Sequence, residues 1–188
     1  ASISKLVVAL GVMLLIIDGK FGLDRDVSLY LGWRVRNPAF PDAVVTMRHL
    51  LSHRSGLRDN IDYIVPLDGD LSAVLAKPEA WEAKHPPGRY FSYANINSPL
   101  IATTMEAVTG ERFDRLMARD AAMNGPDPCA VYPASDGSCD VEKLYRLARN
   151  GSAFSPQGGL RISARDLATV GQLLLNDGKP LLSKAAFD

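Results

Sequence analysis

The chain has 188 residues, of which 47% are apolar and 22% charged, a composition that indicates a globular protein of about one domain with a real core. Its 21 basic residues balance its 21 acidic ones, and no run of like charge stands out, which argues against nucleic acid or an anionic membrane as a partner. The longest apolar run, residues 6–17, is shorter than the roughly 20 residues of a membrane span. We therefore expect a small-molecule or short-peptide substrate.

The first segment, ASISKLVVALGVMLLIIDGK, allows two interpretations. Lys5 followed by an apolar run resembles a secretory signal peptide, but such a peptide should pass into an A-x-A-like cleavage site, whereas Asp18 and Gly19 follow here. Gly19 suits the left-handed position after a helix, and a helix that is apolar all round is typical of a large protein's centre. We therefore predict a buried helix from Ser2 to about Asp18, within a unit formed by residues 1–20.

Ser2 and Lys5 are three residues apart, a spacing that places both side chains on one face of a helix. A serine hydroxyl is a weak nucleophile unless a base takes its proton, and a lysine can be that base when desolvation lowers its pKa. The neighbouring Leu, Val and Ile side chains would supply the desolvation, and a helix N-terminus would favour an oxyanion at an acylated Ser2. Because Ser-x-x-Lys alone is common by chance, a second motif is needed.

Residues 21–188 read mostly as helices. Only VSLYLGWRV, residues 27–35, suggests a strand. Cap residues and apolar spacing predict helices in five segments: 46–56 with Thr46 as N-cap and Gly56 at its end, 98–110 with Ser98 and Pro99 at its start and Gly110 at its end, 111–123, 140–149, and 163–178 between Ser163 and Gly178.

Tyr93 and Asn95 lie in the turn-like stretch HPPGRYFSYANINSPLI, where both side chains can face one cleft while Ala94 faces away. A tyrosine phenol near a cation can shuttle a proton, and an asparagine amide can both donate to and accept from a substrate amide or ester. The alternative is structural, with the tyrosine packed under a loop and the asparagine capping the next helix.

Cys129 and Cys139 lie in a loop rich in Pro, Gly, Ser and Asp, and they could form a disulfide if the compartment is oxidising. The alternative is two unpaired thiols in a cytoplasmic loop. His49, His53 and His85 are far from both cysteines in the sequence, and none of the spacings resembles a zinc motif. We expect no metal and no cofactor.

Four segments together, SISK, MRHLLSHRSGL, PPGRYFSYANINSPLIA and FSPQGGLRISARDLATVGQLLLNDG, resemble the serine β-lactamase and penicillin-binding-protein superfamily in order and approximate spacing. Y-A-N in place of S-D-N resembles its class C-like branch, which includes D-alanyl-D-alanine peptidases, D-aminopeptidases and family VIII carboxylesterases. The resemblance implies that Ser2 is the acylated nucleophile, Lys5 its proton acceptor and Tyr93 the base or proton relay. Asn95 would contact substrate.

The same resemblance implies an α+β fold, in which a helical domain adjoins an antiparallel sheet flanked by helices. It also implies a periplasmic or secreted location, with a cytoplasmic one as the alternative. The chain itself, residues 1–188, reads as a mostly α-helical part of such a domain. Residues 1–20 would be the nucleophile helix, and residues 21–188 the helical subdomain.

Two parts of the family pattern are missing. The third motif, Lys-Thr-Gly or His-Thr-Gly, does not occur before Asp188, and Arg54-Ser55-Gly56 imitates it but belongs to the end of the HRSGL segment. The strands and helix that precede the nucleophile in family members are also absent. We therefore expect a fragment whose full-length protein is a serine hydrolase and which is inactive in isolation. A catalytically inactive receptor or sensor of the same fold and an unrelated secreted helical binding module are the alternatives.

Overall fold

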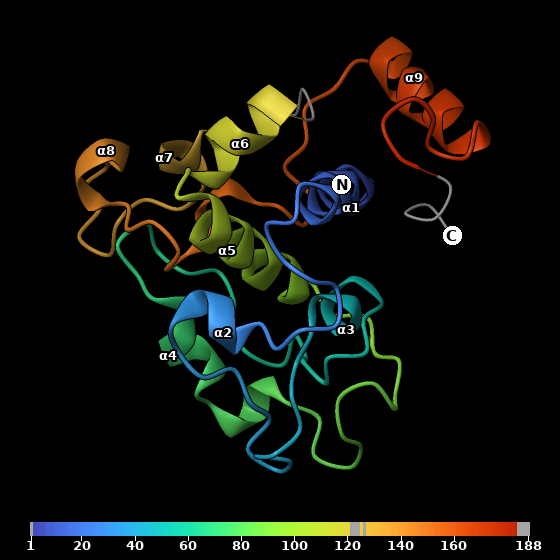
Figure 1. Cartoon of the computed structure of the whole chain (residues 1–188). Coiled ribbons are helices and arrows are strands. Elements are labelled where there is room, and N and C mark those ends of the chain that lie inside the picture. Colours follow the sequence, from blue (N-terminus) through green and yellow to red (C-terminus); the bar gives the residue numbers. More distant parts are fainter. Residues whose placement is uncertain (1, 121–124, 126, 184–188) are drawn as a thin grey trace.

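A computed structural model of the chain describes residues 2–120, 125 and 127–183. β-Pairing between described residues consists of two isolated antiparallel bridges, Asp26 with Thr46 and Leu57 with Trp81, so the prediction of a mostly helical chain is confirmed. The helices shown in Figure 1 are, in chain order, α1 (Ser4–Ile17), α2 (Ser28–Leu31), α3 (Met47–Leu51), α4 (Leu71–Leu75), the 3₁₀ helix η1 (Pro78–Ala80), α5 (Asn97–Thr109), α6 (Phe113–Asp120), α7 (Pro128–Val131), α8 (Val141–Leu144), the 3₁₀ helix η2 (Gly151–Phe154) and α9 (Ala164–Leu175).

Helix α1 begins two residues later than predicted, because Ser2 lies in the turn that precedes it. Its C-terminal end agrees with the prediction. Gly19 adopts a φ of 70°, and the N–H of Lys20 donates to the carbonyl of Leu15 at 2.9 Å. This pairing satisfies a carbonyl of the last turn, which is why a left-handed glycine ends the helix well.

One face of α1 is buried, rather than most of its surface. Ile17 is 48% exposed; burial of α1 on most sides is expected for the intact protein and stays a prediction. A Cβ on Gly11 would lie 2.9 Å from the sulfur of Met117 in α6, so the two helices are in close contact there. The buried residues of α1 are Ser4, Val7, Val8, Gly11, Val12 and Leu15.

Helix α5 is the centre of the fold, and α1, α2, α3, α6 and η2 pack around it (Figure 1). Its first ten residues, 97–106, are all buried. Helix η2 approaches it so closely that a Cβ on Gly151 would lie 2.6 Å from the carbonyl oxygen of Pro99. At the far end Gly110 takes a φ of 69° and terminates the helix as predicted.

Several predicted elements are wrong or shorter than expected. The expected strand 27–35 contains α2 instead, because Asp26 accepts a hydrogen bond from the N–H of Ser28 at 3.0 Å and starts a helical turn, which Gly32 ends at φ 72°. The expected helix 140–149 stops after α8, where Tyr145 turns into an extended conformation.

The cap predictions agree better with the structure. Thr46 accepts a hydrogen bond from the N–H of His49 and caps α3, although the helix ends at Leu51, well before Gly56. Helix α5 begins at Asn97, so Ser98 and Pro99 lie inside it rather than capping it.

The expected helix 111–123 is α6 as far as Asp120, and positions 121–123 lie outside the described residues. Ser163 caps α9, as predicted, through the N–H of Asp166. Helix α9 ends at Leu175, three residues before Gly178, and buries none of its residues. Figure 1 shows it set apart from the helices around α5.

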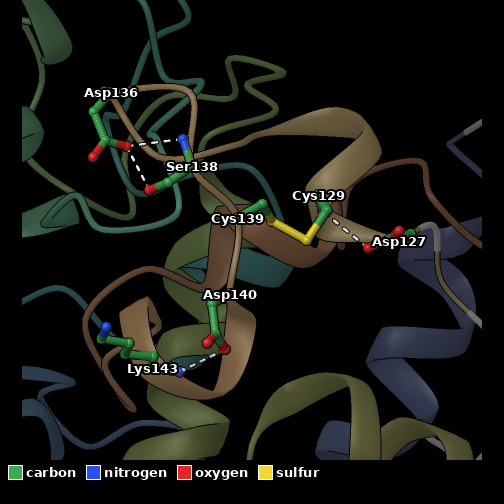
Figure 2. Close-up of a disulfide and its surroundings, with 7 residues drawn as sticks. All are labelled: Asp127, Cys129, Asp136, Ser138, Cys139, Asp140 and Lys143. Atoms are coloured by element: carbon green, nitrogen blue, oxygen red, sulfur yellow. Dashed lines mark hydrogen bonds between the residues drawn. A yellow bond between two sulfur atoms is a disulfide. The ribbon is translucent and has the colours of Figure 1, made fainter.

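A disulfide joins Cys129 and Cys139, whose Cα atoms are 5.5 Å apart (Figure 2). This confirms the pairing that the spacing suggested. Asp127 caps α7 by accepting from the N–H of Cys129, and Asp140 caps α8 by accepting from the N–H of Lys143. A ring of this size stabilises the folded state by about 2–3 kcal/mol on the chain-entropy model.

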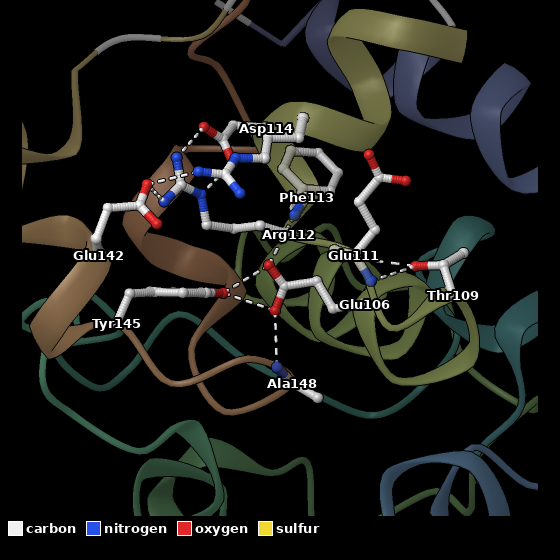
Figure 3. Close-up of polar contacts among 10 residues, drawn as sticks. Glu106, Thr109, Glu111, Arg112, Phe113, Asp114, Glu142, Tyr145 and Ala148 are labelled. Atoms are coloured by element: carbon white, nitrogen blue, oxygen red, sulfur yellow. Dashed lines mark hydrogen bonds and ion pairs between the residues drawn. The ribbon is translucent and has the colours of Figure 1, made fainter.

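A buried carboxyl group, that of Glu106, ties α5 to two other segments (Figure 3). Its two oxygens accept from the hydroxyl of Tyr145, from the N–H of Phe113 at 2.8 Å and from the N–H of Ala148 at 2.9 Å. Burial raises the pKa of Glu106 to about 7, even though these donors favour the carboxylate. The group therefore titrates near neutral pH inside the core.

Candidate active site

Ser2 and Lys5 come together at the start of α1. The N–H of Lys5 donates to the carbonyl of Ser2 at 3.1 Å and closes a turn, so the predicted spacing holds although the helix starts later. The ammonium of Lys5 lies 3.4 Å from the hydroxyl oxygen of Ser2. Both side chains lie at the N-terminal end of a 14-residue helix, where the helix dipole favours negative charge.

Tyr93, which is 91 residues away in sequence, contacts the same hydroxyl. The oxygens of Tyr93 and Ser2 are 2.9 Å apart, so the reach that a proton relay needs is present. The ammonium of Lys5 also lies 5.1 Å from the centroid of the Tyr93 ring. Hydrogen bonding from Lys5 and then from Ser2 lowers the pKa of the Tyr93 phenol below its ordinary value.

Lys5 has three oxygen acceptors around its amino group. Besides Ser2, these are the side-chain oxygen of Asn95 and the backbone carbonyl of Gln157, each at 2.9 Å. An ammonium carries three protons to donate and has no lone pair, so this arrangement suits a protonated lysine. The Lys5 amino group and the Tyr93 hydroxyl are thus both within reach of the Ser2 hydroxyl.

Asn95 is held in one orientation by groups on both sides of its amide. Its oxygen accepts from Lys5, while its NH₂ group donates to Asp59 at 2.9 Å. Asp59 also accepts from the backbone N–H groups of Asn95 at 2.8 Å and of Ile96 at 3.1 Å. The Tyr-Ala-Asn turn is therefore anchored by one carboxylate, and Ala94 faces away into the core, as expected.

His53 packs against the site from the segment after α3. Its ring stacks on that of Tyr93, with centroids 4.3 Å apart and an angle of 25° between the planes. Desolvation, followed by the positive charge of Lys5, lowers the pKa of His53. Sequence spacing bears on this histidine only as a metal ligand and does not predict the contact with Tyr93.

Three contributing residues were missed from sequence: His53, Asp59 and Gln157. The signal that points to them is their position within or beside HRSGL and FSPQGGL, two segments that carried the family resemblance. The side chain of Ser55 is buried, and its hydroxyl donates to the side-chain oxygen of Asn97 at 2.6 Å. This structural role is consistent with the prediction that Arg54-Ser55-Gly56 is not the third motif.

A small cavity lies beside the candidate active site. A cavity of about 80 Å³ lies between α1, α3 and α5 against Lys5 and His53, which is small beside the roughly 300–1,000 Å³ of a ligand pocket. Within the described ranges, no three His, Cys, Asp or Glu side chains are grouped to hold a metal ion. No helix in that part of the chain has the length and apolar character to cross a membrane.

The amino-acid sequence of this chain is similar to those of known proteins. The family model described as Beta-lactamase matches residues 1–186. Penicillin-binding protein 4* of Bacillus subtilis (strain 168) is 31% identical over 118 residues, which cover 58% of this chain and 25% of that protein. The chain therefore spans about a quarter of this curated relative.

Two solved structures have the same fold over the whole chain. The structure of SurE with D-Leu matches with a TM-score of 0.69 and 26% identity, and this chain covers 44% of it. A D-stereospecific amidohydrolase from Streptomyces sp. matches with a TM-score of 0.73 and 24% identity, and this chain covers 62% of it.

Proposed function

Because this chain belongs to the beta-lactamase family, we propose that it carries the nucleophile of a serine hydrolase that works through an acyl-enzyme. The observation that carries the proposal is the short contact between the hydroxyls of Ser2 and Tyr93, with Lys5 donating to the first. Ser2 is the nucleophile in this mechanism. Tyr93, whose pKa is lowered, acts as a phenolate. It takes the proton of the Ser2 hydroxyl while the Ser2 oxygen attacks the substrate carbonyl, and it then gives that proton to the leaving group.

Lys5 and Asn95 support this transfer in different ways. The ammonium of Lys5 stabilises the phenolate of Tyr93 and orients the hydroxyl of Ser2. The side-chain oxygen of Asn95 accepts from Lys5, and its NH₂ group donates to Asp59. The same side-chain amide, fixed in this orientation, contacts the substrate. The sequence resemblance implies Lys5 as the proton acceptor and Tyr93 as the base or relay; we assign the proton transfer to Tyr93, and the three oxygen contacts of Lys5 support this choice.

The substrate class we propose is an ester or amide of a small molecule or short peptide, with β-lactam turnover a weaker activity. The likeness to SurE, solved with D-Leu, supports a substrate that contains a D-amino acid. A periplasmic or secreted location belongs to the same proposal and is supported by the disulfide, since such bonds persist in oxidising compartments. A panel of p-nitrophenyl esters, D-amino acid anilides, D-Ala-D-Ala peptides and nitrocefin, tested on the full-length gene product, ranks these substrates.

The mechanism is tested by covalent labelling of the full-length gene product with a fluorescent fluorophosphonate. Ser2→Ala should abolish labelling. Lys5→Ala and Tyr93→Phe should each slow it by at least about 10²-fold, and the double variant by little more than the worse single one, because both act on one proton transfer.

Two outcomes would contradict this mechanism. Labelling of Ser2→Ala at the wild-type rate would place the nucleophile elsewhere. A correctly folded wild-type protein that takes no label and turns over no substrate in the panel would be the inactive receptor or sensor of the same fold.

A further inference from the structure

His53 is bonded in a way that fixes its tautomer. The backbone N–H of Ala94 and the side-chain NH₂ of Asn97 both lie 3.2 Å from its Nδ1. A backbone N–H can only donate, so Nδ1 is the acceptor and the proton of the neutral ring lies on Nε2. An imidazolium would place a proton between two donors, so these contacts require the neutral form.

The ring of His53 contacts Tyr93 and the peptide group that follows it. Its face stacks on the phenol ring at 4.3 Å between centroids, and its Nδ1 holds the peptide N–H that immediately follows Tyr93. The backbone of the two segments is also paired, since the carbonyl of His53 accepts from the N–H of Ser92 at 2.9 Å. Tyr93 is 49% exposed, so these contacts supply restraint that burial does not.

The backbone of His53 is itself unusual. It adopts a φ of 54°, a left-handed conformation that few residues other than glycine take up. Such conformations persist where the surroundings fix them, and they gather at functional sites. Here the conformation turns the side chain from the end of α3 toward the Tyr-Ala-Asn turn.

We propose that His53 is a positioning residue for Tyr93, whose neutral ring fixes both the phenol and the peptide after it so that the Tyr93 hydroxyl stays within reach of Ser2. This inference rests on the proposed function, because it concerns how the base of that reaction is held. Lys5 and Asp59 are the charged groups whose fields reach both rings.

Two variants separate the contacts of His53. In His53→Asn the amide oxygen can still accept from the N–H of Ala94, and asparagine tolerates a left-handed backbone, but the stacked ring is lost. In His53→Phe a flat ring remains without any acceptor. The matched control is His85→Asn, because His85 also stacks on a tyrosine, Tyr90, at 4.8 Å between centroids.

The measurement is the rate constant for fluorophosphonate labelling of the full-length gene product as a function of pH. In the wild type the rate should rise with pH as Tyr93 loses its proton. We expect His53→Phe to slow labelling by about 10²-fold and His53→Asn by about tenfold, since small misplacements of a reacting group have effects of this size. Both should move the midpoint of the rise to higher pH, because Tyr93 loses its fixed place beside Lys5 and Ser2.

His85→Asn should keep the wild-type rate and midpoint. A loss of rate without a change of midpoint in the folded His53 variants would assign His53 a merely structural role and overturn the proposal, as would an unchanged rate. If His53→Phe does not fold, as judged by circular dichroism, the midpoint of His53→Asn decides. A wild type that takes no label contradicts the proposed function, whereas a labelled wild type with unaffected His53 variants contradicts this inference alone.

Discussion

Glu106 couples the stability of the core to pH. Its pKa in the folded chain is about 7, against an ordinary value of 4.5, so between these two pH values the folded protein holds a proton that the unfolded chain has released. Stability from this group is therefore complete below about pH 4.5 and is lost as pH rises through about 7. The shift corresponds to about 3 kcal/mol.

Glu106→Gln should remove this pH dependence and lower stability most at low pH, where the wild-type carboxyl is protonated, so that the two stability profiles converge as pH rises through about 7. One carboxyl oxygen faces the N–H of Phe113 and the other that of Ala148, so either orientation of an amide sets its NH₂ group against a backbone donor. We expect a loss of about 1–3 kcal/mol at pH 5 and a flatter profile between pH 5 and 7. Urea unfolding of both proteins at several pH values measures this, and parallel profiles would contradict the assignment.

The residues of the site were predicted from sequence only where local spacing or family motifs reported them. Ser2 and Lys5 are neighbours on one helical turn, and Tyr93 and Asn95 share one turn. Their mutual approach, and the orienting roles of Asp59 and His53, depend on how distant loops pack, which no local pattern records.

At the scale of elements, caps were predictable and lengths were not. Thr46, Ser163 and Gly110 act where the sequence placed them because capping satisfies backbone groups within one turn. The predicted helix 140–149 ends early because of a contact outside its own segment, since the hydroxyl of Tyr145 donates to Glu106 in α5. A tertiary contact there overrides a good helical pattern.

Two glycines test these different constraints on elements. Gly19→Ala should cost about 1 kcal/mol, because its φ is left-handed but nothing lies within 4 Å of a new Cβ. Gly151→Ala should cost about 3 kcal/mol, because its Cβ would lie within 2.7 Å of backbone atoms of α5 that cannot move aside. Urea unfolding compares the two, and equal losses would show that η2 does not pack tightly on α5.

At the scale of the whole molecule, apolar side chains remain exposed on α1 and α9. Ile17 is 48% exposed and Leu175 is 85% exposed. Helix α9 buries none of its residues, although its sequence has an apolar face. Exposed apolar side chains that gather on one surface are typical of contacts with other protein.

The 188-residue chain produced by itself should therefore bind a hydrophobic dye and self-associate as its concentration rises. Replacing Ile17 and Leu175 together with Lys should weaken both effects, whereas Leu29→Lys, at an exposed side chain on α2, should leave them unchanged if the contact involves α1 and α9. Sedimentation velocity and dye fluorescence measure these properties. A chain that stays monomeric and binds no dye would show that these side chains form no adhesive surface.

The contacts of Lys5 also bear on the order in which the molecule folds. Its amino group donates hydrogen bonds to Asn95 and Gln157, which lie 90 and 152 positions further along the chain. Closing such long loops is slow compared with forming a helix. The hydroxyl of Ser2 therefore acquires its partners late, after α5 and the segment beyond η2 have docked. If Ser2 is the nucleophile proposed above, a newly made or partly unfolded full-length protein should stay inert toward acylating compounds, and the amount of label should count the molecules that have finished folding.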